Sequence, residues 1–233
     1  MEDDDVRMPG PDSRLAMIGR TGSGKTQAAL WHLSRADFEE RPWVILDYKR
    51  EKLFGKIQRA ESIDLDEVPD EAGIYILRIR PDKKKQMTDW FRRAWEHENI
   101  GILVDEGYMI DQHDEWFVAC LTQGRSKRIQ MIVLSQRPVW VSRFVFSEAD
   151  FFQIFDLSHS EDKDKLGEYI RDEDQAELDE PLKDYNSFYY DVGRRRLETF
   201  GKVDREDVIL AAIDTKLKAI EAEEEHRSVR RAL

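Results

Sequence analysis

Glycines, a lysine and a threonine near the start of the chain have the spacing of a phosphate-binding loop. Residues 19–26 read Gly-Arg-Thr-Gly-Ser-Gly-Lys-Thr and match G-x-x-x-x-G-K-[ST] at every fixed position. Glycines let successive backbone N–H groups turn toward phosphate oxygens, and a helix that follows presents the positive end of its dipole to the same anion. In such loops the lysine reaches the β- and γ-phosphates and the threonine hydroxyl ligates Mg²⁺.

The alternative interpretation is an ordinary glycine-rich turn between a strand and a helix, but a full match of this pattern by chance is rare. The motif therefore predicts that the chain binds ATP and Mg²⁺. Lys25 is expected to act in catalysis as well as in binding, and Thr26 to be a metal ligand. The predicted nucleotide-binding residues are Gly19, Arg20, Thr21, Gly22, Ser23, Gly24, Lys25, Thr26 and Gln27.

Two adjacent carboxylates follow an apolar run further along the chain. Residues 100–104 read Ile-Gly-Ile-Leu-Val, and Asp105 and Glu106 come directly after them. Asp105 is expected to hold the Mg²⁺ ion through its water shell. Glu106 lies one residue further on, on the other side of the strand, and is expected to orient and deprotonate the attacking water. Such a pair is common in loops, and it is the phosphate-binding motif upstream that favours the catalytic interpretation.

A polar residue follows the next apolar run as well. Ser135, Gln136, Arg137 and Pro138 come after residues 129–134. The amide of Gln136 can both donate and accept hydrogen bonds, so we predict that it contacts the γ-phosphate or the attacking water. Pro138 also ends the strand, which is compatible with that role.

These residues require a sheet that places them along one edge. Apolar runs alternate with helical segments, and because both faces of each run are apolar, the pattern predicts a mainly parallel sheet between helices, in the α/β class. The expected strands are 15–18, 43–47, 74–79, 100–104 and 129–134, and the expected helices are 25–35, 81–97 and 115–127. The charged stretch before Gly73 is poorly periodic, and no strand is expected in it.

The pattern changes after Pro138. We expect one more strand at 151–157, a charged helix at 161–170, and a hairpin of 187–192 with 196–200 at the sheet edge. The tail carries apolar residues on one helical face: Ile209, Ile213, Leu217 and Ile220. Through this face the helix could dock a partner, close a ring or pack on its own domain. The expected organisation is a flexible leader at 1–12, an ATPase domain at 13–204 and a C-terminal amphipathic helix at 205–233.

The acidic charge is local. The chain has a formal net charge of −12, which at first argues against a protein that wraps a phosphate backbone. Residues 2–5 are all acidic, and residues 161–184 hold 11 acidic against 4 basic side chains, so the remainder is close to neutral. We expect both acidic segments to lie away from any path for nucleic acid.

Composition also constrains the compartment. The single cysteine, Cys120, excludes an internal disulfide, fits a reducing compartment and is expected in the core. The acidic N-terminus differs from a signal peptide, and no apolar run reaches the roughly 20 residues that span a bilayer. We therefore expect a cytoplasmic protein without direct membrane insertion.

Together the motifs resemble the FtsK–HerA superfamily of DNA-pumping ATPases over roughly residues 13–160. The phosphate-binding loop, Val-Asp-Glu and Ser-Gln-Arg-Pro carry the resemblance, with Asp47-Tyr48-Lys49-Arg50-Glu51 standing where that family often has Asp-Pro-Lys-Gly-Glu. The compact length most resembles the genome-packaging ATPases of tailless viruses with an internal membrane. The resemblance implies a RecA-like P-loop fold and an Mg²⁺-dependent ATPase that translocates double-stranded DNA, packaging a viral genome into a preformed capsid.

The resemblance further implies a hexameric ring with ATP bound between subunits and an arginine supplied by the neighbour. Gly124-Arg125 matches the position of that arginine; Arg128 is the second choice and Arg143 the third. The alternative for Arg125 is a cation that favours the negative end of a helix dipole. Such a motor would dock on a capsid vertex or portal-type partner, in the host cytoplasm or associated with the virion.

The candidates for DNA contact are the basic runs at residues 83–85, 125–128 and 194–196. Each run is also typical of a solvated surface. In a ring of six subunits, a basic run that faces the pore occurs six times, and the focused electrostatic field then makes even a modest cluster sufficient. The other functions that the residues leave open are an ATPase for phage or filament extrusion or for plasmid transfer, and a nucleotide-gated assembly scaffold without turnover.

Overall fold

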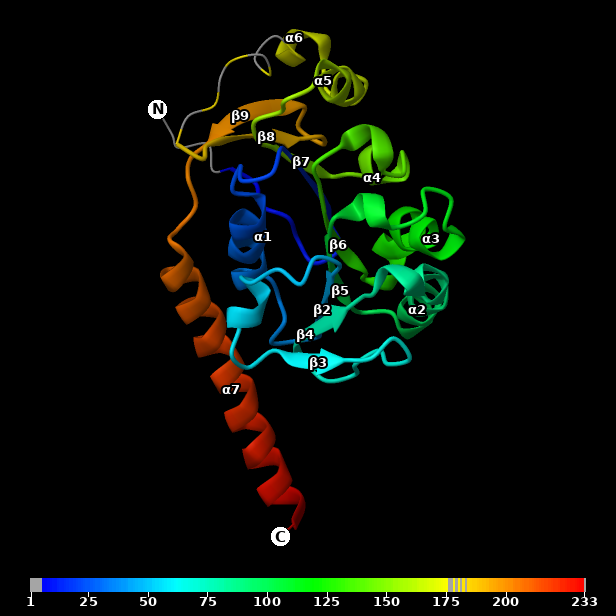
Figure 1. The fold of residues 1–233 in the computed structure, drawn as a ribbon. Coiled ribbons are helices and arrows are strands. Elements are labelled where there is room, and N and C mark those ends of the chain that lie inside the picture. Colours follow the sequence, from blue (N-terminus) through cyan, green and yellow to red (C-terminus); the bar gives the residue numbers. More distant parts are fainter. Residues whose placement is uncertain (1–5, 176–177, 179, 181, 183, 233) are drawn as a thin grey trace.

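A nine-stranded sheet forms the centre of the computed structural model, which describes residues 6–175, 178, 180, 182 and 184–232 (Figure 1). The strand order is β3-β4-β2-β5-β6-β1-β7-β8-β9, parallel from β3 to β7, with β8 and β9 added antiparallel at one edge. The strands are β1 (Arg14–Ile18), β2 (Pro42–Asp47), β3 (Glu61–Ile63), β4 (Gly73–Arg78), β5 (Gly101–Asp105), β6 (Gln130–Ser135), β7 (Phe151–Ile154), β8 (Ser187–Asp191) and β9 (Arg196–Phe200).

Helices cover both faces of this sheet, as its doubly apolar strands require. Figure 1 shows α1 and α7 on one face and α2, α3 and α4 on the other. Their bounds are α1 (Lys25–Ser34), α2 (Lys84–His97), α3 (Glu115–Gln123), α4 (Phe144–Ser147), α5 (Ser160–Gly167), α6 (Asp172–Gln175) and α7 (Glu206–Ala232). Successive residues of a strand enter different cores: Val44 packs on the α2–α3 side and Ile45 on the α1–α7 side.

The parallel strands place the motif-bearing segments at one edge. The loops that follow β1, β2, β5 and β6 all leave the sheet at the carboxyl ends of their strands. The bond from Gly19 N to the Ser135 carbonyl joins two of those ends at 3.2 Å. Ligands of open α/β sheets bind at this edge. The topology therefore brings four separated sequence segments to one site.

The predicted strands and the hairpin at the sheet edge are confirmed, with bounds shifted by a residue or a few. The strand predicted at 151–157 ends at Ile154, because the chain then turns to bond Arg20 N with the Asp156 carbonyl at 2.9 Å. The prediction that the stretch before Gly73 contains no strand is wrong. β3 pairs there with β4 through its backbone, and its mostly exposed edge position leaves no apolar pattern to detect.

Three predicted helices differ in their ends. The helix predicted at 81–97 begins as a 3₁₀ turn, and α2 itself starts at Lys84. The one predicted at 115–127 becomes 3₁₀ from Gly124, where the chain tightens toward β6 and Ile129 N bonds the Gly124 carbonyl at 2.8 Å. The helix predicted at 161–170 is α5, which ends at Gly167.

The apolar face of α7 packs on its own domain. Ile209, Ile213 and Leu217 are buried against α1, and Arg59 holds the outer face through Asp214 at 2.9 Å. Figure 1 shows the C-terminal end of α7 running past the body of the molecule. Cys120 lies in the core as expected. No helix among the described residues combines the length and hydropathy that a membrane crossing requires.

Candidate active site

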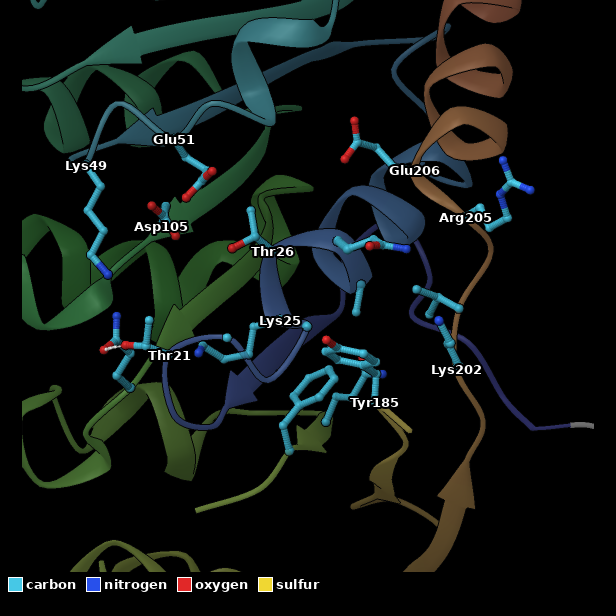
Figure 2. A pocket seen from close by; sticks show the side chains of 18 of the residues that line it. Thr21, Lys25, Thr26, Lys49, Glu51, Asp105, Tyr185, Lys202, Arg205 and Glu206 are labelled. Carbon is cyan, nitrogen blue, oxygen red and sulfur yellow. Dashed lines mark hydrogen bonds between the residues drawn. The ribbon is translucent and has the colours of Figure 1, made fainter. Parts of the chain in front are cut away.

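The glycine-rich loop forms the centre of a cavity of about 600 Å³ at the carboxyl edge of the sheet (Figure 2). The loop connects β1 to α1, and two of its glycines have left-handed backbone angles, with φ of +77° at Gly22 and +98° at Gly24. These angles are open to glycine at little cost. Lys25 is buried, and its Nζ donates to the Gly19 carbonyl at 2.6 Å and the Arg20 carbonyl at 2.9 Å.

The N-terminus of α1 is suited to an anion. Gly24 caps the helix without a side-chain hydrogen bond, and the first turn contains no acidic residue. The first N–H groups of a helix lack partners within the helix and carry the positive end of the dipole. Together with the Lys25 ammonium, they form a cradle for phosphate groups.

Two buried carboxylates lie side by side next to this cradle. Asp47 ends β2 and Asp105 ends β5, and the two residues are paired in register. Asp47 is 0% exposed and Asp105 4% exposed. Each has one oxygen, Oδ2, that is buried without a hydrogen-bond partner. Such atoms are costly to bury; the Arg78 guanidinium lies 3.7 Å from Asp47 Oδ2, so Asp105 Oδ2 is the atom that most requires a further partner.

Burial also shifts the protonation of these groups. The pKa of Asp105 is raised to about 6, chiefly by burial, with Lys49 and Lys25 opposing the shift and Asp47 and Glu51 adding to it. The pKa of Asp47 is raised chiefly by burial too. Burial lowers the pKa of Lys25 to about 8, with repulsion from Lys49 adding to the shift. The site thus holds buried charged groups that neighbouring side chains compensate only in part.

These residues fit an Mg²⁺ ion bound together with a phosphate. The unpartnered Asp105 Oδ2 and the half-buried Thr26 both line the cavity. No group of three or more His, Cys, Asp or Glu side chains able to hold a metal occurs in the part of the chain that the structure describes. Mg²⁺ is typically bound by one or two protein oxygens, with water and substrate phosphates completing its shell.

Glu106 faces the same cavity as Asp105. Strand alternation alone would direct the two side chains to opposite sides, but Glu106 has a left-handed backbone with φ of +64°, which turns it back toward the cavity. Its Oε1 accepts hydrogen bonds from Lys49 Nζ and, at 2.5 Å, from Gln136 Nε2. Thr21 Oγ1 donates to Gln136 Oε1 at 2.5 Å. A polar chain therefore connects the second carboxylate to the phosphate-binding loop.

The predicted loop residues divide by position. Thr21, Gly22, Gly24, Lys25, Thr26 and Gln27 line the cavity. Arg20 turns away and pairs with Asp156 at 2.5 Å, and Ser23 is buried with its Oγ unpartnered. Gly19 does not line the cavity; it approaches Phe155 too closely for any larger side chain.

Arg125 lies at the opposite edge of the sheet. It precedes β6, whereas Gln136 follows it, and a six-residue strand spans roughly 20 Å. Its side chain is 60% exposed and forms an ion pair with Asp150. Arg128 lies at this edge too, and Arg143 follows β6 and packs on the Phe144 ring. Arg125 and Arg128 therefore lie far from the cavity of their own chain.

The basic runs occupy different edges. Residues 83–85 span the end of the 3₁₀ turn and the start of α2, after the carboxyl end of β4; the side chain of Lys84 lies outside the described residues. Residues 194–196 form the β8–β9 turn at the same edge as Arg125, where Arg194 pairs with Asp191. Of the acidic segments, residues 2–5 lie outside the described residues, and Asp162 pairs with Arg137 at 2.9 Å.

Several cavity residues had no assigned role in the sequence. Lys49 and Glu51 belong to the Asp-Tyr-Lys-Arg-Glu run, whose position after a strand was a usable signal. The opposite wall carries no motif and comes from the chain before β8 and after β9: Tyr185, Gly201, Lys202, Val203, Arg205, Glu206 and Asp207.

Comparison with known proteins gives one strong sequence relative. The chain is 41% identical over 216 residues to the DNA packaging ATPase P9 of Enterobacteria phage PRD1, covering 90% of this chain and 95% of that protein. No family model matches.

Solved structures share the fold at low sequence identity. The genome packaging NTPase B204 of Sulfolobus turreted icosahedral virus 2, in complex with AMPPCP, superimposes with a TM-score of 0.68 at 16% identity over 84% of this chain and all of that one. VirB4 of Thermoanaerobacter pseudethanolicus gives a TM-score of 0.65 at 10% identity, covering 85% of this chain and 92% of that one.

Proposed function

This chain belongs to the family of viral DNA-packaging ATPases, and from that premise we propose that it is an ATP-hydrolysing motor that moves double-stranded DNA into a preformed capsid. The observation that carries the catalytic part is the convergence on one cavity of a phosphate cradle, a buried unpartnered Asp105 and a second carboxylate, Glu106, bonded to Gln136. Nucleotide binding also agrees with the AMPPCP complex of the structural neighbour B204.

The cradle binds the triphosphate. Lys25 and the N-terminus of α1 neutralise the β- and γ-phosphates, and phosphate replaces the loop carbonyls as partner of the Lys25 ammonium. Thr26 and Asp105 would hold Mg²⁺, which supplies further neutralisation of phosphate charge when bound. Negative phosphate next to Lys25 favours its charged form and offsets the effect of burial.

Glu106 acts as the general base. Its carboxylate accepts a proton from the water that attacks the γ-phosphorus. Lys49 and Gln136 both donate to Oε1 of this carboxylate, which fixes its position. Because Gln136 also accepts from Thr21, a movement of the phosphate-binding loop changes the position of the base. Gln136 thereby couples the presence of phosphate in the loop to the position of the general base, Glu106.

Arg125 completes the site of a neighbouring subunit. Its place at the far edge of the sheet prevents it from reaching its own cradle, so it can act only in trans. A head-to-tail interface of this kind closes into a ring, for which we propose six subunits. Stabilising negative charge on the transferred phosphoryl group is the expected contribution of the arginine.

The proposed partners follow from this arrangement. Double-stranded DNA passes through the ring, contacted along its backbone by basic side chains, and a capsid vertex or portal-type protein holds the motor in place. The motor then acts where capsids are filled, in the host cytoplasm or associated with the virion.

The test is ATP hydrolysis measured with and without duplex DNA. A packaging motor is expected to hydrolyse ATP faster on duplex DNA, whereas an extrusion ATPase would hydrolyse ATP without that stimulation and a scaffold would bind without turnover. Stimulation by unrelated polyanions to the same extent would contradict the proposal.

The trans role of Arg125 has its own test. Lys25→Ala subunits keep the arginine but lose the cradle, and Arg125→Ala subunits keep the cradle but lose the arginine. Mixed rings are expected to recover part of the activity that each variant lacks alone, since some interfaces then combine an intact cradle with an intact arginine. No recovery in mixed rings would contradict the role.

A further inference from the structure

The cavity continues past the phosphate cradle to a second wall. Figure 2 shows Lys49, Glu51 and Asp105 on one side of Lys25 and Thr26, and Tyr185, Lys202 and Arg205 on the other. The second wall, here called the base-side wall, consists of Tyr185 and the segment 201–207, in which every residue except Asp204 lines the cavity. Tyr185 precedes β8, and the segment leads from β9 into the first turn of α7.

The orientation of a bound nucleotide follows from the cradle. Its γ-phosphate must lie next to Glu106 and Asp105 for hydrolysis, so the other end of the molecule has to point away from them. The base-side wall lines the cavity in that direction. The base and ribose of the nucleotide are the groups that would reach it.

Tyr185 has the features of a stacking platform. Its side chain is 60% exposed although it is large and apolar, and its ring lies against the phosphate-binding loop, where a Cβ on Gly24 would meet Tyr185 Cδ1 at 3.4 Å. Lys202 Nζ lies 5.3 Å from the centroid of the same ring. An exposed aromatic ring next to a polar cavity stacks well on a flat base, and a nearby cation adds to that attraction.

The backbone holds this ring at a cost. Asp184 and Tyr185 both have left-handed angles, with φ of +53° and +63°. Each such residue costs of order 1 kcal/mol, and strain of this kind persists mainly where a site depends on it.

The rest of the wall is fixed relative to the cradle. Gln27, in the first turn of α1, donates from Nε2 to the Asp204 carbonyl at 2.7 Å. Trp31 Nε1 donates to Asp204 Oδ2 at 2.9 Å, and Glu206 pairs with Lys56 at 2.6 Å. The wall is therefore in place before a ligand arrives, which reduces the entropy lost on binding.

We propose that the base-side wall binds the base and ribose of the nucleoside triphosphate, with the base stacked on the Tyr185 ring. This inference rests on the proposed function, because the orientation of the nucleotide comes from the hydrolytic groups. It assigns a binding role to a segment without a motif and connects nucleotide occupancy to the start of α7.

The experiment compares two ligands, ATP and inorganic tripolyphosphate, by calorimetry in the presence of Mg²⁺. Both occupy the cradle, but only ATP has a base. Tyr185→Ala is expected to weaken ATP binding about tenfold and to leave tripolyphosphate binding within twofold of the wild type. Tyr185→Phe, which keeps the ring, is expected to restore ATP affinity. Val208→Ala is the matched control, since Val208 is an exposed apolar residue of α7 that does not line the cavity.

Other results would overturn the inference. Equal weakening of both ligands by Tyr185→Ala would mean that the tyrosine acts only by supporting Gly24 and the cradle. An unchanged ATP affinity, or a wild-type protein that binds ATP no more tightly than tripolyphosphate, would mean that the wall does not contact the base. Failure of the motor function is separate, because it would remove the stimulation by DNA while this ligand comparison kept its outcome.

Discussion

The two sides of the cavity are built in different ways. The phosphate side consists of one contiguous loop, the first turn of α1 and buried charged groups at strand ends. The base-side wall consists of more exposed side chains on the irregular chain before β8 and after β9 and on the first turn of α7. In the proposed function, hydrolysis depends on the phosphate side, where the sheet fixes the positions of the side chains. The base-side wall can change affinity without touching the reacting atoms.

The difference predicts two kinds of variant. Changes on the phosphate side should alter turnover or the binding of any triphosphate. Changes on the base-side wall should alter only ligands that carry a base, with smaller effects.

Glu106→Gln is expected to lower the rate of ATP hydrolysis by about 10²–10⁴-fold, because the amide cannot accept the proton of the attacking water. ATP affinity should stay within a few-fold, since the cradle is unchanged. Single-turnover hydrolysis and calorimetry measure the two effects separately. Glu115→Gln, an exposed carboxylate in the first turn of α3, is the control. A wild-type rate in Glu106→Gln would exclude Glu106 as the base.

Lys25→Met is expected to weaken both ATP and tripolyphosphate about 100-fold, because a buried charge opposite phosphate contributes roughly 2–5 kcal/mol. The two ligands should lose affinity equally, which is the opposite of the result expected for Tyr185→Ala. Calorimetric titration with each ligand measures the loss. A loss confined to ATP would contradict the division between the two sides.

Raising the pH above 8 is expected to weaken ATP binding, by up to about fivefold between pH 8 and 9. The pKa of Lys25 is about 8 because of burial, so above that pH the free protein holds a neutral amine, while bound phosphate favours the ammonium. Binding therefore takes up a proton, and affinity is full below pH 8 and falls as the pH rises. Calorimetry in buffers of different ionisation enthalpy detects the proton.

The arginine variant supplies the control for this pH effect. Lys25→Arg stays charged and should remove the dependence. Proton release on binding, or an unchanged dependence in Lys25→Arg, would assign the effect to another group.

Asp204→Ala is expected to have the smallest effect: a loss of about 1 kcal/mol in the free energy of unfolding and a few-fold loss in ATP affinity, with turnover at saturating ATP unchanged. The variant removes the hydrogen bonds from Trp31 and Arg35 that hold the base-side wall on α1. Thermal unfolding and steady-state kinetics measure it. Glu96→Ala, which breaks an exposed pair with Arg92, is the control. A fall in turnover would connect this wall to the chemistry.

Much of the phosphate side was predictable because its information is local. The loop from Gly19 to Thr26 specifies its own turn, and a strand followed by Asp105 places a carboxylate at the sheet edge whatever its neighbours are. The strands, which are apolar on both faces, likewise predicted a parallel sheet between helices, since the residue types along each strand indicate which faces are buried. The edge strand β3 was not predicted because backbone hydrogen bonds to β4 hold it and its sequence carries no apolar pattern.

What the sequence determined by itself is the set of candidate site residues at the strand ends and the kind of sheet that holds them. The tertiary structure decided which groups meet. It turned Glu106 toward Asp105 through a left-handed backbone, brought Lys49 onto that carboxylate, and laid Tyr185 against Gly24. Contacts of this kind join segments far apart in the chain, and their geometry depends on strand order and packing, which no local spacing encodes.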